Sequence, residues 1–384
     1  MSRYDERTLL DTVRWISALM VLFGHTWAAL FVREPTVLSR ALFALADTRH
    51  EWVTLFFVLS GYLVAGGALV RGADRFSLKH YAVARFSRIY IVLLPALALT
   101  VALDSLAFDI NPASPVHAGP WADGLFGATP PFANYDWSHI LFSLLSLEPF
   151  NGSTAMGSDG PLWTLGFEWV FYLCFPPLML LADALGRRLG GQNKDGAVWL
   201  MRGVVLVASV AFLVVRHMPY AALLWLIWIG GAVAHLIART DRWPSVLRWA
   251  GLGVCVAGFL LLPRIDYRVA DALIGFGFIA FLARFPEGER GLGPRVDKTL
   301  ASASYSLYVT HLPVVALACL GFIQAGWLHA GGEVIGVRSL AMLAAISVVS
   351  LAVSVVFYAL FERNTDRLRR AMLASGSVLV ARRA

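Results

Sequence analysis

The sequence predicts an all-helical integral membrane protein with about ten transmembrane helices, and two observations carry that prediction. Hydrophobic residues make up 58% of the 384 residues and charged residues 15%. With a mean hydropathy of +0.67, this composition is far more apolar than that of a soluble domain. Apolar runs of about 18 to 25 residues, long enough to cross a hydrocarbon core roughly 30 Å thick, recur from residue 8 to residue 362.

These runs leave no polar gap large enough for a soluble domain. The chain is therefore expected to form one membrane domain over residues 1–370, followed by a short basic cytoplasmic tail over residues 371–384. A further run at 138–150 is too short to span and predicts an interfacial or re-entrant helix. The predicted spans cover residues 8–32, 51–70, 89–108, 160–184, 197–215, 219–238, 246–263, 268–285, 299–325 and 335–362.

The distribution of basic residues predicts how the protein is oriented. The termini and the connections that follow even-numbered spans carry 23 Lys and Arg residues, whereas the connections that follow odd-numbered spans carry 7. Because basic residues near span ends are retained in the cytoplasm, both termini are expected to be cytoplasmic. The 109–159 connection has no Lys or Arg and is then the largest external loop, expected to cover a bound acceptor.

Several common classes of active site are excluded. The sequence has no GxGxxG, GxxxxGK[ST], HExxH or GxSxG motif, so soluble nucleotide-binding and hydrolase functions find no support. Cys174, Cys255 and Cys319 lie in apolar runs without CxxC or Cys/His spacing, which predicts neither a disulfide framework nor a metal site. Membrane topology explains the pI near 9.5, so no nucleic-acid partner is expected.

Two ionisable residues interrupt the first apolar run, in RWISALMVLFGHTW at 14–27. A charged arginine at the bilayer centre costs on the order of 3 kcal/mol or more, so such residues indicate function. The spacing of Arg14 and His25 places both on one helical face, about 16 Å apart along the axis. They are expected to line one slot through the membrane. The alternative for His25 is a packed histidine bonded to a backbone carbonyl.

A second basic pair stands at the cytoplasmic end of the third predicted span, in LKHYAVARFSRIYIVLLP at 78–95. Arg85 and Arg88 are three residues apart and share one helical face. Guanidinium groups so placed hold phosphate through charge-assisted hydrogen bonds. Ordinary positive-inside flanking charge also explains the pair, and position alone does not decide between the two.

Between residues 160 and 176, Glu168 is the sole acid of the apolar helix predicted from SDGPLWTLGFEWVFYLCFP at 158–176. That helix enters from outside near Gly160, so Glu168 is expected about 12 Å deep, at a depth similar to that of His25. A carboxylate there would orient the imidazole or bind an acceptor hydroxyl. The alternative is a structural hydrogen bond to a serine, tyrosine or tryptophan of a neighbouring helix.

A polar stripe runs through SASYSLYVTHLPVVAL at 302–317, in the cytoplasmic half of the ninth predicted span. Small hydroxyl residues often serve helix packing, which is the favoured interpretation for Ser304 and Ser306. His311 lies near midspan and is expected to line the slot or to brace Glu168. The other hydroxyl residues of the stripe are Tyr305, Tyr308 and Thr310.

Together these segments resemble membrane acyltransferase family 3, over nearly the whole length of the chain. Two positions differ from the family pattern. Trp169 stands where members often carry a second glutamate, and Asn364 stands where a proline commonly follows the final Glu-Arg. The segments that carry the resemblance are the Arg-x10-His first span at 14–25, FFVLSGYLVAG at 56–66, RxxRIY at 85–90, LWTLGFEWVFYL at 162–173, SYSLYVTHLP at 304–313 and FYALFERNTDRLRR at 357–370.

The resemblance implies transfer of an acyl group, usually acetyl, from acyl-coenzyme A (acyl-CoA). It implies that the donor approaches from the cytoplasm, with its phosphates held by Arg85, Arg88 and Arg14 and its pantetheine arm reaching toward His25. His25 would act as general base on an acceptor hydroxyl arriving from outside, or would carry the acyl group covalently. Glu168 would orient His25 or the acceptor. The expected slot-lining residues are Trp163, Tyr305, Tyr308 and His311.

The expected partners are the lipid bilayer and a glycan or lipid-linked glycan acceptor, such as O-antigen or exopolysaccharide, at a bacterial inner membrane and without a metal. A small-molecule acceptor and a succinyl donor stay open, because the sequence does not show pocket size. A proton-coupled secondary transporter would instead use Arg14, Glu168 and His25 as a relay, although matching broken repeats are not evident. A structural or sensor protein would leave these three residues unexplained.

Overall fold

A computed structural model describes residues 5–72, 75–117, 134–151, 154–189, 219–240, 242–284 and 293–381. Every regular element within these ranges is a helix, and one isolated parallel bridge pairs Phe31 with Glu333. The chain forms two compact units, which are described separately. The first contains Met1–Glu6, Val53–Tyr81 and Phe167–Glu289, and the second contains Arg7–Trp52, Ala82–Gly166 and Arg290–Ala384.

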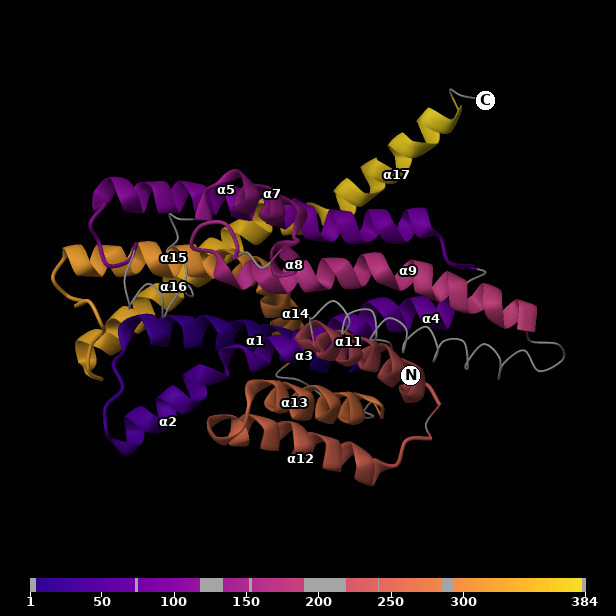
Figure 1. Cartoon of the computed structure of the whole chain (residues 1–384), viewed down its shortest axis with the longest axis horizontal. Coiled ribbons are helices and arrows are strands. Elements are labelled where there is room, and N and C mark those ends of the chain that lie inside the picture. The colour runs from indigo at the N-terminus through magenta and orange to yellow at the C-terminus, as the bar shows by residue number, and fades with distance from the viewer. Residues whose placement is uncertain are drawn as a thin grey trace. The chain divides into compact units, whose positions relative to one another are not determined.

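Figure 1 labels the helices in chain order. Those lying mostly in the first unit are α3 (Glu51–Ser60), α4 (Gly67–Arg71), α9 (Trp163–Leu189), α11 (Pro219–Ala238), α12 (Ser245–Leu261) and α13 (Tyr267–Leu282), and a π-helical segment, Gly61–Gly66, joins α3 to α4. Those lying mostly in the second unit are α1 (Asp5–Leu30), α2 (Val37–Ala46), α5 (Leu78–Ile110), α7 (Trp137–Leu145), α8 (Glu148–Asn151), α14 (Pro294–Ser302), α15 (Ser304–Gln324), α16 (Val337–Leu360) and α17 (Thr365–Ala381).

Seven helical segments of the described residues are long and apolar enough to cross a membrane, and each overlaps a predicted span. Of the other three predictions, 197–215 lies outside the described residues and 160–184 corresponds to α9. The third, 268–285, corresponds to the 16-residue helix α13, which is about 24 Å long. The seven segments are Thr8–Leu30, Val37–Arg71, Leu78–Ile110, Pro219–Ala238, Ser245–Arg264, Ser304–Gln324 and Val337–Ala374.

Some predicted boundaries are wrong, and each has a local cause. The span predicted at 299–325 is interrupted at Ala303, where α14 ends and α15 begins. The helix of the third span begins at Leu78 rather than at residue 89, because its first turns are helical even though they carry polar and charged residues. Helix α2 was not predicted, although Thr36 marks its start by accepting a hydrogen bond from the backbone N–H of Ser39.

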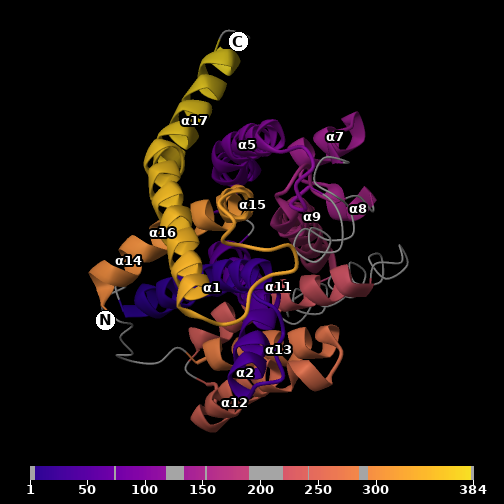
Figure 2. The same ribbon diagram turned by 90° about the vertical axis from the view of Figure 1, so that its left-hand side faces the viewer.

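In the first unit, α11 packs against the π-helical segment and against α13, and α12 runs beside α13 (Figures 1 and 2). Glycines make the first of these contacts close. A Cβ added at Gly61 would collide with the carbonyl group of Trp228, and one added at Gly231 would collide with that of Val58. This approach brings the indole Nε1 of Trp228 within 3.0 Å of the Ser60 hydroxyl.

Replacing Gly231 by leucine is expected to lower the melting temperature and the yield of folded protein, because overpacking of this kind costs about 1–3 kcal/mol or more. Thermal unfolding of the purified protein measures the effect. The matched control is Gly253→Leu on α12, where an added Cβ meets nothing within 4 Å. Equal melting temperatures for the two variants would show that the close approach at Gly231 is not needed.

In the second unit, α15 is buried on every side over much of its length and packs along α16 (Figure 2). All residues from Ser306 to Ala316 are buried, and Pro313 lies inside the helix without ending it. The polar stripe predicted at 302–317 therefore faces protein rather than lipid. Its polar groups need hydrogen-bond partners within the protein.

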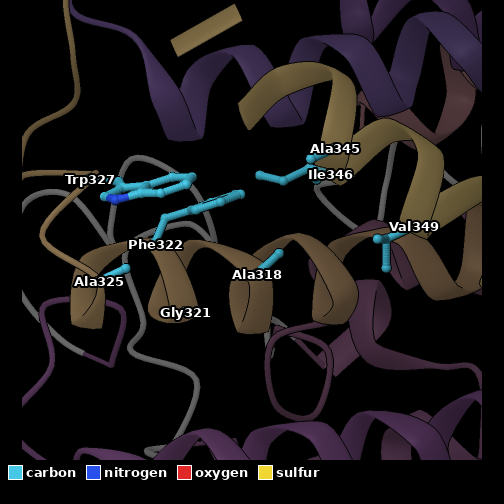
Figure 3. Close-up of a pocket in the computed structure, with 8 residues that line it drawn as sticks. All are labelled: Ala318, Gly321, Phe322, Ala325, Trp327, Ala345, Ile346 and Val349. Carbon is cyan, nitrogen blue, oxygen red and sulfur yellow. The ribbon is translucent and has the colours of Figure 1, made fainter. Parts of the chain in front are cut away.

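A groove of about 340 Å³ lies between the second half of α15 and the first half of α16 (Figure 3). The rings of Phe322 and Trp327 are stacked, with centroids 6.0 Å apart. No titratable side chain lines this groove, so it offers no group for acid–base chemistry. Its lining residues are Ala318, Gly321, Phe322, Ala325, Trp327, Ala345, Ile346 and Val349.

Candidate active site

Two histidines from different helices of the second unit meet inside the protein. Nε2 of His311, on α15, lies 3.1 Å from Nδ1 of His25, on α1, and the ring centroids are 5.1 Å apart. His311 is only 1% exposed, whereas His25 is half-buried. The sequence indicated both residues as site candidates but gave no sign that they touch each other.

The hydrogen-bond partners of the two rings determine which nitrogens carry hydrogen. Nδ1 of His311 lies 2.8 Å from the carbonyl oxygen of Tyr308, and Nδ1 of His25 lies 3.0 Å from that of Val21. A carbonyl oxygen only accepts, so in the neutral rings both Nδ1 atoms are assigned the hydrogen. Nε2 of His311 is then an acceptor for the Nδ1–H of His25.

This assignment leaves an unprotonated nitrogen on the half-buried ring. Nε2 of His25 makes no hydrogen bond to any residue that the structure describes. The carbonyl bond considered as the alternative for His25 is present, but it engages Nδ1 together with His311 and leaves Nε2 with a lone pair. An imidazole oriented through Nδ1 and open at Nε2 has the arrangement of a general base.

The start of α9 is fastened next to the histidine pair through Tyr308, one helical turn before His311. The hydroxyl of Tyr308 donates to the carbonyl oxygen of Pro161 at 2.8 Å and lies 2.7 Å from Oγ1 of Thr164. Tyr308 is buried. Although the sequence predicted a slot-lining role, the contacts of Tyr308 hold the 160–164 segment against α15.

Trp163 lies within that segment and stacks on His50. The ring centroids are 5.3 Å apart and the planes differ by 12°. Both side chains are half-buried, so the pair keeps part of its surface accessible. Accessible aromatic faces with a few polar groups nearby are typical of sites for organic ligands.

Arginines from two helices lie near each other in the second unit. Nη1 of Arg88, on α5, lies 2.7 Å from Oε1 of Glu362, and its guanidinium group lies 5.0 Å from the centroid of the Tyr305 ring. Arg14, on α1, is 3.4 Å from Asp11 and interacts electrostatically with Arg88 and Glu362. The side chains of Arg14 and Arg88 are 25% and 33% exposed.

The basic residues and the histidines of the second unit lie apart along α1. Helix α1 is continuous from Asp5 to Leu30, so Arg14 and His25 are separated by about 16 Å along its axis. Arg85 lies one turn before Arg88 on α5 and is half-buried. Within the second unit, the chain thus combines a basic end with an imidazole pair.

Glu168 belongs to the first unit, where it takes part in a separate hydrogen-bond network. The hydroxyl of Ser60 donates to Oε1 of Glu168 at 2.8 Å, and the hydroxyl of Tyr172 donates to the same oxygen. The indole N–H of Trp228 donates to Ser60. The bond from Ser60, on α3, is a contact of the kind that the structural alternative predicted, whereas Tyr172 lies on the same helix as Glu168 and Trp228 bonds Ser60. In the second unit, His311 bonds His25 and the carbonyl oxygens of Leu307 and Tyr308, and the expectation that it braces Glu168 stays a prediction.

A comparison with protein families decides which class of protein carries this site. The sequence profile of a family described as an acyltransferase domain matches residues 8–359. The chain belongs to acyltransferase family 3. It is therefore an O-acyltransferase, as the resemblance of its motifs implied, and its apolar helices make it a multi-pass membrane protein.

Curated proteins similar to this acyltransferase come from bacteria and a phage. An acyltransferase of Streptomyces mycarofaciens, MdmB, is 26% identical over 90% of this chain and 87% of its own length. An O-acetyl transferase of Shigella phage Sf6 is 23% identical over 79% of this chain and 83% of its own. Nodulation protein 10 of Rhizobium leguminosarum bv. viciae is 29% identical over 45% of this chain and 44% of its own. No solved structure matches the chain.

Helix α5 of this acyltransferase carries a polar cluster that was not predicted from the sequence. Asp104 is buried, accepts hydrogen bonds from the backbone N–H and the hydroxyl of Ser158 at 2.9 and 2.6 Å, and accepts another from the hydroxyl of Tyr135 at 2.7 Å. It thereby joins two parts of the predicted external loop, of which residues 118–133 and 152–153 lie outside the described residues. The available signal was an isolated acid in the apolar run ALTVALDSLAF at 98–108.

Stability is expected to fall as the pH rises through neutrality, because Glu148 on α8 is fully buried. Burial raises the pKa of Glu148 from 4.5 to about 7. Between these values the folded protein retains a proton that the unfolded chain has released. The free energy of unfolding therefore decreases with rising pH, by up to about 3 kcal/mol for this group.

Glu148→Gln is accordingly expected to make the melting temperature less dependent on pH between 5 and about 8. The variant is expected to raise the melting temperature most at the alkaline end of this range. Asp109→Asn is the matched control, since Asp109 is exposed near the end of α5. If Glu148→Gln and wild type lost the same number of degrees over this range, the buried carboxyl would not be the cause.

Proposed function

We propose that this enzyme transfers an acyl group, most simply acetyl, from cytoplasmic acyl-CoA to a hydroxyl of a surface or exported glycan, at a bacterial inner membrane. The observation that carries the proposal is the bond between His311 and His25, which leaves Nε2 of His25 with a lone pair. An imidazole nitrogen with such a lone pair is able to remove the proton of a hydroxyl. The relative named an O-acetyl transferase supports acetyl as the group transferred.

The proposed reaction is a direct transfer. The acceptor oxygen attacks the thioester carbonyl carbon while Nε2 of His25 takes the hydroxyl proton. The new C–O bond forms, the C–S bond breaks, and the proton on His25 passes to the sulfur, which leaves as the CoA thiol. His311 accepts the Nδ1–H of His25 throughout, so it stabilises the transient imidazolium and fixes the orientation of the ring.

The basic end of the site is proposed to bind the donor. Arg14, Arg85 and Arg88 would hold the phosphates of acyl-CoA, and two of them have exposed surface for this purpose. The pantetheine arm would extend from there toward His25, over the interval of about 16 Å along α1. This division of the site keeps the charged part of the donor away from the imidazole pair.

The acceptor is proposed to bind near the accessible Trp163–His50 pair. Trp163 belongs to the 160–164 segment, which is bonded by Tyr308, one helical turn before His311. The predicted external loop would cover it. Glu168 is proposed to orient the acceptor rather than His25, because the bonds found for Nδ1 of His25 are to His311 and Val21.

Mass analysis of the surface polysaccharide tests the function. A strain lacking this gene would be complemented with wild type or with His25→Ala at matched expression. The proposal predicts an ester-linked acyl group with wild type alone, whose mass distinguishes acetyl from succinyl. An unchanged polysaccharide in all strains would contradict the glycan acceptor and direct the search to small-molecule acceptors, and flux of a substrate without release of CoA thiol would contradict transfer itself.

A further inference from the structure

Glu362 lies in the turn between α16 and α17 and is a buried carboxylate at the basic end of the second unit. Its side chain is only 3% exposed. One oxygen, Oε1, accepts from Nη1 of Arg88 at 2.7 Å. The other, Oε2, accepts from both the backbone N–H and the hydroxyl of Ser306, at 3.1 and 2.7 Å.

A carboxylate so buried needs full compensation, because desolvation of an ion costs several kcal/mol. Arg88 compensates one oxygen of Glu362 with its positive charge, and the two hydrogen-bond donors of Ser306 compensate the other. Ser306 is the third residue of α15, so the carboxylate also occupies the N-terminal end of that helix, where backbone N–H groups and the helix dipole favour negative charge. The side chain thus joins α5, α15 and the end of α16 in one network.

The network constrains the guanidinium group of Arg88. Arginine has five N–H donors, and Glu362 engages Nη1. The Tyr305 ring lies on one side of the guanidinium group, 5.0 Å from its centroid. A flexible arginine would lose rotamer entropy on binding a phosphate, whereas one held in place has already lost it.

The same network reaches the histidine pair along α15. Ser306 precedes His311 by five residues, a rise of about 7.5 Å, on a helix that is buried throughout this stretch. Anchoring of Ser306 by Glu362 therefore fixes the position along the helix axis at which His311 meets His25. One carboxylate connects the proposed donor-binding end to the proposed base.

We infer that Glu362 is a positioning residue for the acyl donor: it holds Arg88 in the orientation that binds a donor phosphate and anchors the start of α15. The inference rests on the proposed function. It assigns to Glu362 an effect mainly on donor affinity, transmitted through Arg88, rather than a chemical step.

The test measures the KM for acetyl-CoA and kcat by CoA thiol release, for the full-length protein in lipid nanodiscs. Glu362→Gln keeps the shape of the side chain but removes the charge, and is expected to raise the KM about 10-fold or more while changing kcat about 3-fold or less. Glu362→Asp keeps the charge on a shorter stem and is expected to give an intermediate KM. Glu333→Gln is the matched control, since Glu333 forms ion pairs with Arg338 and His329 away from this network.

A double-mutant cycle with Arg88→Ala separates positioning from general stabilisation. If Glu362 acts through Arg88, Glu362→Gln adds less than about 2-fold to the KM in the Arg88→Ala background. The inference would be overturned if the effects of the two substitutions on the KM multiplied in the double variant, or if the KM of Glu362→Gln equalled that of wild type. Should Glu362→Gln fail to accumulate as folded protein, the KM of Glu362→Asp decides, and a wild-type value overturns it equally. A wild type that releases no thiol from acetyl-CoA would instead contradict the proposed function.

Discussion

Replacing His25 by alanine is expected to lower the rate of acyl transfer about 100-fold to 10,000-fold, the range for loss of a general base, while leaving the affinity for acetyl-CoA unchanged. The reason lies in the hydrogen bonds of the ring. Nδ1 is engaged by His311 and the Val21 carbonyl, which directs the lone pair of Nε2 away from both. Alanine removes the only group at this end of the site to which the proposed mechanism assigns the proton.

The measurement is kcat for ester formation, with donor affinity determined separately by binding of acetyl-CoA. His329→Ala is the control, because His329 is an imidazole in the 326–336 connection whose side chain is 71% exposed. A variant His25→Ala that keeps more than about a tenth of the wild-type kcat would exclude a general-base role. An acyl group trapped covalently on the wild-type protein, and absent from His25→Ala, would replace direct transfer by an acyl-histidine.

Replacing His311 is expected to have the second-largest effect, about 10-fold to 100-fold on kcat, the range for loss of a group that orients another side chain. Nε2 of His311 accepts the Nδ1–H of His25, and Nδ1 of His311 is itself fixed by the Tyr308 carbonyl. Without this acceptor the His25 ring is free to rotate or to change tautomer. The KM for acetyl-CoA is expected to stay near the wild-type value.

Two comparisons distinguish this positioning role from a general loss of packing. The amide oxygen of His311→Gln is able to accept the same hydrogen, so this variant is expected to retain more activity than His311→Ala. In the His25→Ala background, His311→Ala is expected to add little further loss. Equal activities of the glutamine and alanine variants, or independent losses in the double variant, would contradict the role.

Much of the site could be predicted from the sequence, because charged and polar residues in membrane spans are rare and have few explanations. Arg14 and His25 share one helix, so the regular geometry of that helix was enough to place them on one face about 16 Å apart. His311 and Arg88 were indicated in the same way. The membrane-spanning helices themselves followed from length and hydropathy, and seven of the predicted spans correspond to apolar helices of the described residues.

Contacts between helices could not be predicted, since they depend on how distant segments pack. The His25–His311 and Arg88–Glu362 pairs are separated by 286 and 274 residues in the chain, and no periodicity in one helix reports on its partner in another. Depth alone suggested Glu168 as the partner of His25. In the first unit, Glu168 bonds Ser60 of α3 and Tyr172 of its own helix α9.

The most direct test of the account is the stoichiometry of transfer by the purified protein in nanodiscs, supplied with acetyl-labelled acetyl-CoA and with glycan extracted from the host membrane. The account predicts one CoA thiol released for each acetyl ester formed, with both products dependent on the acceptor and on His25. Esters formed at an undiminished rate by His25→Ala, or substrate crossing the bilayer without thiol release, would contradict it.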